Sequence, residues 1–81
     1  MNLMKLKEYV PAESDRTRVY SCYPDGFERM PYERQLTYDR NAMSNVTLDY
    51  AIERIPDAEI YRVERDSLFR TNVVIYCSIP V

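Results

Sequence analysis

Residues 71–80 read TNVVIYCSIP, the one uninterrupted β-type run in the sequence. Side chains of an extended strand alternate between its two faces. Both faces of this run are apolar enough to be covered: one would carry Val73, Ile75, Cys77 and Ile79, and the other Val74, Tyr76 and Ser78. Such a strand belongs in the middle of a sheet. The run therefore predicts a central strand around which the remaining elements are arranged.

The composition predicts one small folded domain. The chain has 81 residues, of which 46% are hydrophobic and 30% are charged, as in an ordinary globular domain with a single core. No stretch approaches the roughly 18 consecutive apolar residues needed to cross a bilayer, and no apolar segment follows the lysines at the start. We therefore expect a single domain over residues 1–81 that is soluble and cytoplasmic and has no membrane partner.

Two further runs predict strands beside the central one. Residues 16–23 and 59–65 alternate between apolar and polar positions, and residues 66–70 form a connection of hairpin length between the second of these runs and the central strand. Residues 3–10 predict a short edge strand, because lysines flank its apolar positions and Pro11 closes it.

One helix is indicated over residues 44–55. Ser44 is a suitable N-cap, and Pro56 ends the helix because the residue before a proline is pushed out of the helical region. The apolar positions have helical spacing: Leu48, Ala51, Ile52 and Ile55. This stripe would cover one face of the sheet.

The segment between residues 23 and 39 admits two interpretations. Residues 23–26 read YPDG and predict a type I turn that closes a hairpin, with residues 27–30 pairing back. Residues 32–39 alternate like a strand, which we favour, with a bend at Pro31. The alternative is a helix that has Pro31 in its first turn. The predicted fold is α+β: an antiparallel sheet of four to five strands with the 44–55 helix on one face.

The residue types exclude most chemistries. Without histidine the chain lacks the usual general base at neutral pH, and neither Cys22 nor Cys77 has a histidine to activate it. Two distant cysteines cannot complete a closed zinc site, and a single glycine does not make a phosphate-binding loop. We expect no catalytic residues, no metal and no cofactor, and free thiols in preference to a disulfide.

Protein binding is the function that this exclusion leaves. The chain has eight tyrosines, and arginine greatly outnumbers lysine; both types are enriched at the centres of protein interfaces. Phe69 could alternatively fill the end of the core beneath its loop. Self-association as a homodimer is equally compatible with these residues. The candidate partner-binding residues are Tyr32, Tyr38, Leu68, Phe69 and Arg70, with Tyr61 and Tyr76 on the sheet.

Single-stranded nucleic acid is the alternative partner. Tyrosines on an uncovered sheet face can stack on bases while nearby arginines contact phosphates. A net charge of −2 argues against this reading, and such tyrosines can instead cover one another as a second small core. The residues concerned are Tyr20, Tyr61 and Tyr76 with Arg18, Arg62 and Arg65.

A small, single-domain, tyrosine-rich chain of this kind is similar in general style to phage-encoded inhibitors that block a host or defence protein, anti-CRISPR proteins among them. The resemblance involves no motif and no specific residue. It implies an inhibitor that binds and occludes a partner protein.

Overall fold

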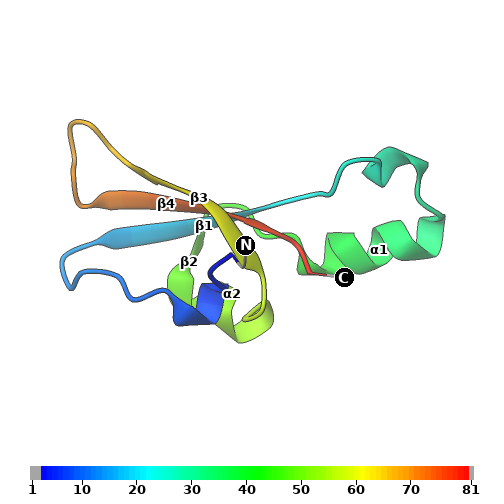
Figure 1. Cartoon of the computed structure of the whole chain (residues 1–81), viewed down its shortest axis with the longest axis horizontal. Coiled ribbons are helices and arrows are strands. Elements are labelled where there is room, and N and C mark those ends of the chain that lie inside the picture. The colour runs from blue at the N-terminus through cyan, green and yellow to red at the C-terminus, as the bar shows by residue number, and fades with distance from the viewer. Residues whose placement is uncertain (1–2, 81) are drawn as a thin grey trace.

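The computed structural model describes residues 3–80, which form an α+β fold (Figure 1). Within these residues a four-stranded mixed sheet has the order β2-β1-β4-β3. Two short 3₁₀ helices, η1 (Leu6–Glu8) and η2 (Phe27–Arg29), precede the two α-helices. The remaining elements are β1 (Arg16–Cys22), α1 (Tyr32–Asn41), β2 (Val46–Thr47), α2 (Leu48–Arg54), β3 (Glu59–Arg65) and β4 (Asn72–Ser78).

Strand β4 lies in the centre of the sheet, as its sequence predicts. It pairs with β3 in an antiparallel sense and with β1 in a parallel sense, so that Ile75 lies between Val63 and Val19. The expectation of a wholly antiparallel sheet is therefore wrong. A parallel pair needs a long crossover, and here the chain passes through both α-helices and β3 between β1 and β4.

One face of the sheet carries the main core. On β4, Val73, Ile75 and Cys77 are each at most 1% exposed. Helix α2 and η1 lie on this side of the sheet (Figure 1). The predicted helical stripe is confirmed: Leu48, Ala51 and Ile55 are buried, and Ile52 packs against them while partly exposed.

Helix α2 begins later than predicted. The N-cap is Thr47 and not Ser44, since the Thr47 hydroxyl accepts a hydrogen bond from the Tyr50 backbone N–H at 3.2 Å. Thr47 and the preceding Val46 pair with β1 as β2, and Asn45 takes a left-handed conformation with φ 55°. The short strand β2 uses the residues that helical propensity assigned to the first turn.

The predicted edge strand over residues 3–10 is wrong except for one bridge between Lys5 and Glu59. The chain turns into η1 because Leu6 is fully buried in the core and its backbone N–H donates to the Ala58 carbonyl at 2.8 Å. The Glu8 carboxylate closes this turn by accepting from the Lys5 N–H at 2.8 Å. The segment therefore covers the core from the side.

The hairpin predicted after β1 and the strand predicted over residues 32–39 are both wrong. Gly26 has the expected positive φ of 81°, but residues 27–29 then form η2 and the chain continues into α1. The alternative helix is correct, with the Arg34 and Gln35 N–H groups donating to the Pro31 carbonyl at 3.0 Å. The helix is held because Tyr38, 2% exposed, packs edge-on against Phe27 and forms a second small cluster.

Candidate functional site

The structure does not bring the predicted partner-binding residues together. Leu68, Phe69 and Arg70 lie in the connection between β3 and β4, whereas Tyr32 lies on α1 at the opposite end of the molecule (Figure 1). Tyr38 is buried and contributes no surface. Tyr61 lies on β3 and Tyr76 on β4. These residues therefore belong to three separate regions.

The first region is the hairpin tip, which we define as Leu68 and Phe69. Their exposed fractions are 84% and 66%, among the highest of the large apolar residues in the described part of the chain. Phe69 therefore does not fill the end of the core, and that alternative is wrong. Two adjacent large apolar side chains in solvent need an explanation beyond folding, because neither contributes to the core.

The backbone of the hairpin tip is held by local hydrogen bonds. One carboxylate oxygen of Asp66 accepts from the N–H groups of Leu68 at 2.7 Å and Phe69 at 2.9 Å. These two donors hold the pKa of Asp66 below its usual value. The Asn72 N–H donates to the Phe69 carbonyl at 2.8 Å, and the Asp66 N–H donates to the Asn72 carbonyl at 3.0 Å. The turn is thus ordered by the chain's own hydrogen bonds.

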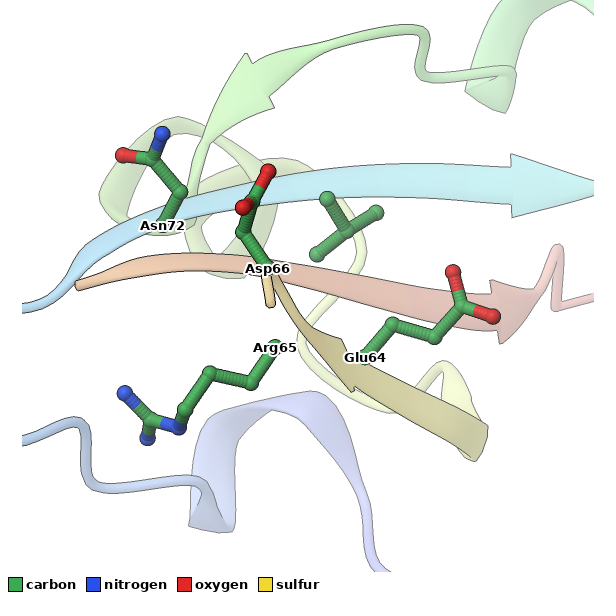
Figure 2. Close-up of a pocket in the computed structure, with 5 residues that line it drawn as sticks. Glu64, Arg65, Asp66 and Asn72 are labelled. Atoms are coloured by element: carbon green, nitrogen blue, oxygen red, sulfur yellow. The ribbon is translucent and has the colours of Figure 1, made fainter. Parts of the chain in front are cut away.

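Arg65 ties this turn to the loop that precedes β1. Its guanidinium donates to both carboxylate oxygens of Asp15, at 2.9 and 3.0 Å, and also to the Arg70 carbonyl. The Asp15 side chain is 4% exposed, and the hydrogen bonds from Arg65 hold its pKa below the usual value. Figure 2 shows Arg65 directed away from Glu64 and Asp66. Arg65 is thus a structural residue and does not share a face with the sheet tyrosines.

The second region is the sheet face opposite α2, which we call the open face. None of its side chains is fully buried. Strand register places Cys22 and Ser78 at one end and Arg16 and Asn72 at the other. The open face consists of Arg16, Arg18, Tyr20 and Cys22 from β1, Asn72, Val74, Tyr76 and Ser78 from β4, and Glu59, Arg62 and Glu64 from β3, with Asp66 just beyond the end of β3.

Three open-face side chains form a stack across three strands. The rings of Tyr20 and Tyr76 are 5.8 Å apart between centroids with 22° between their planes, and the Arg62 guanidinium carbon lies 5.6 Å from the Tyr76 centroid. Register places Tyr76 between the other two, so both faces of its ring are in contact with this chain's own groups. This arrangement matches the reading in which the tyrosines cover one another.

Tyr61 lies at an irregularity in the β3 register, and its hydroxyl shares a 2.6 Å hydrogen bond with the Cys22 thiol. This bond raises the pKa of Tyr61 to about 12, so its hydroxyl stays protonated at neutral pH. Both cysteines are free, as expected. They lie on opposite faces of the sheet, since Cys77 belongs to the core, and burial raises the pKa of Cys77 to about 11. Neither the geometry nor this pKa activates a nucleophile.

Charged residues flank the open face near the hairpin, and of these only Arg18 was singled out from the sequence. Glu64 and Asp66 line a shallow depression of about 360 Å³ whose other walls include Asn72 and Val74 (Figure 2). Arg16 and Arg18 lie on the neighbouring strand β1, and residues 3–80 supply no ion-pair partner for either. In the sequence, Arg16 and Arg18 are two residues apart, as are Glu64 and Asp66. That the two pairs lie on the same face of the sheet follows only from the strand register.

No protein-family model, no curated protein and no solved structure matches the chain. Among residues 3–80, no three histidine, cysteine or acidic side chains cluster as metal ligands would. None of the helices described is long and apolar enough to cross a membrane.

Proposed function

We propose that this chain is a non-enzymatic interaction module that binds another protein by inserting the hairpin tip into an apolar pocket. The observation that carries the proposal is the exposure of Leu68 and Phe69 on a turn whose backbone is already fixed. By filling that pocket, the module would occlude it and act as a small inhibitor.

The energetics favour such a role for the hairpin tip. Burying a Leu or Phe side chain is worth about 1.5 to 3 kcal/mol, and large side chains that enter a well-packed pocket dominate binding. Association also costs the entropy of ordering loops at the interface. The Asp66 and Arg65 contacts remove much of that cost because they order the turn in the free protein. The hairpin tip is therefore a better anchor than Tyr32, which lies exposed on α1.

Nucleic-acid binding has weaker support. Tyr20, Tyr76 and Arg62 do share the open face, which favours that reading. Base stacking, however, needs free ring faces, and the ring of Tyr76 is in contact on both sides. Arg62 contacts Glu64, which offsets its charge toward phosphates. These contacts make protein the better-supported partner.

Affinity capture with matched variants tests the proposal. The immobilised chain would be exposed to lysate of cells in which it is naturally expressed, together with the double variant Leu68→Ser/Phe69→Ser and the control Tyr32→Ser. The control removes an exposed aromatic residue at the opposite end of the molecule.

We expect wild type and the control to retain the same protein in stoichiometric amount, and the tip variant to retain it at least about 30-fold less tightly, the loss of roughly 2 kcal/mol typical of an anchor residue. All three should unfold within about 0.5 kcal/mol of one another, because the changed side chains are exposed. Equal retention by the tip variant would contradict the proposal, as would the absence of any protein bound stoichiometrically to wild type.

A further inference from the structure

On the open face, basic residues of β1 lie across β4 from acidic residues on the β3 side. Register aligns Arg18, Val74 and Glu64 in one row across β1, β4 and β3, which gives a basic, an apolar and an acidic position. A second row runs from Arg16 on β1 to Asn72 on β4 and then to Asp66, whose backbone N–H donates to the Asn72 carbonyl. Both charged groups on β1 are therefore basic, whereas the β3 side carries Glu64 and Asp66 beside one arginine, Arg62, which contacts Glu64. Strand β4 lies between the two sides.

This order makes the open face complementary to itself. We propose that two copies of the chain associate through their open faces about a twofold axis parallel to β4. Such an axis places β1 of one copy over β3 of the other and keeps each row opposite the same row. Arg18 of one copy then faces Glu64 of the second copy, and Arg16 faces Asp66.

The centre of the face suits the same arrangement. Val74 lies opposite Val74 and Tyr76 opposite Tyr76, because β4 lies on the axis. Tyr20 lies opposite Arg62 of the second copy, which repeats between copies the contact that Arg62 already makes with Tyr76 within one chain. Half-exposed apolar and aromatic groups thus meet at the centre, with ion pairs at the rim, the usual anatomy of an interface.

The size of the face sets the strength of the association. Three strands at a spacing of about 4.8 Å, each rising about 3.3 Å per residue, present a footprint of about 15 by 23 Å. This footprint of about 350 Å² per copy is smaller than that of stable specific interfaces, so we expect a weak dimer that forms only at high micromolar concentration and weakens at high salt.

A second copy fits this face better than an unrelated protein does. Arg16 and Arg18 have no ion-pair partner within residues 3–80, while acidic groups of the same face lie one strand beyond β4. The twofold axis supplies partners for both arginines without any further molecule. It also places both hairpin tips at the same end, so the dimer would present two anchors side by side.

Charge reversal tests the dimer and its register. Sedimentation velocity at protein concentrations from about 1 to 500 µM, a range that spans a weak self-association, would compare wild type with Arg18→Glu, Glu64→Arg and the double variant Arg18→Glu/Glu64→Arg. Each single variant places like charges opposite one another and should weaken the dimer at least about tenfold. The double variant restores opposite charges in reversed order and should recover most of the association.

Wild type that remains monomeric at all concentrations would overturn the inference, as would single variants that dimerise like wild type. Failure of the double variant to recover would contradict the register, provided that circular dichroism shows the native fold. The result is separable from the proposed function. The tip variant Leu68→Ser/Phe69→Ser should dimerise like wild type, and partner capture through the hairpin tip does not require the dimer.

Discussion

The two faces of β4 differ although they belong to the same seven residues. Val73, Ile75 and Cys77 are at most 1% exposed beneath α2 and η1, whereas Val74 and Tyr76 on the other side remain partly exposed. Both sets are apolar enough to be buried. The difference teaches that β4 places its stabilising contacts on one face and leaves the other partly exposed, the face through which we propose that two copies associate.

The stability of the core between the sheet and its helices should depend on η1 as strongly as on α2. Leu6→Ala is expected to lower the free energy of unfolding by about 2 to 5 kcal/mol, because it leaves a cavity beside a fully buried residue. Leu3→Ala is the matched control, since Leu3 is exposed, and should cost less than about 0.5 kcal/mol. Urea unfolding measures both. A loss of unfolding free energy in Leu6→Ala no larger than that in Leu3→Ala would show that η1 is not part of the core.

The buried thiol should make stability fall at alkaline pH. Burial raises the pKa of Cys77 from 9.0 to about 11, so the unfolded chain loses this proton first. The stability that the protonated Cys77 thiol contributes is fully present below pH 9.0 and is lost as pH rises through about 11. Urea unfolding between pH 8 and pH 11 should therefore show a steeper decline in wild type than in Cys77→Ala. The same decline of stability with pH in wild type and in Cys77→Ala would show that the Cys77 thiol is not the group responsible.

The tie between Arg65 and Asp15 should have a smaller effect, at the opposite end of the pH scale. The pKa of Asp15 lies below its usual 3.8 in the folded chain, so the tie stabilises the fold above that pH and is lost as pH falls through the lowered pKa. Asp15→Asn should therefore be less stable than wild type at pH 7 and equal to it in strong acid. A difference that persists unchanged in acid would rule out an ionic origin.

The regular strands and the stripe of α2 were predictable because their signals are local. Alternation placed β1, β3 and β4 within about a residue of their observed bounds, and helical spacing identified Leu48, Ala51 and Ile55. The parallel pairing of β1 with β4 and the burial of Leu6 were not predictable, because both depend on how distant segments meet. In residues 32–39, alternation indicated a strand, but packing of Tyr38 on Phe27 stabilises a helix.

The candidate site was predictable only in part. The hairpin tip followed from two apolar residues in a short loop, although the sequence could not say whether Phe69 pointed inward. Tyr32 and Tyr38 were assigned to the same surface because their helix was read as a strand. The alignment of Arg18 with Glu64 could not be predicted, because it arises from the parallel pairing of β1 with β4 together with the antiparallel pairing of β3 with β4.

The most direct test of the difference between the two faces is the free energy of unfolding of Ile75→Ala against that of Val74→Ala. The two residues are adjacent in β4 and differ in the face they occupy. At about 1 µM, where self-association is negligible, Ile75→Ala should lose about 2 to 5 kcal/mol and Val74→Ala less than about 1 kcal/mol. Equal losses would contradict the division of β4 into a face that stabilises the fold and an exposed face that contributes little to stability.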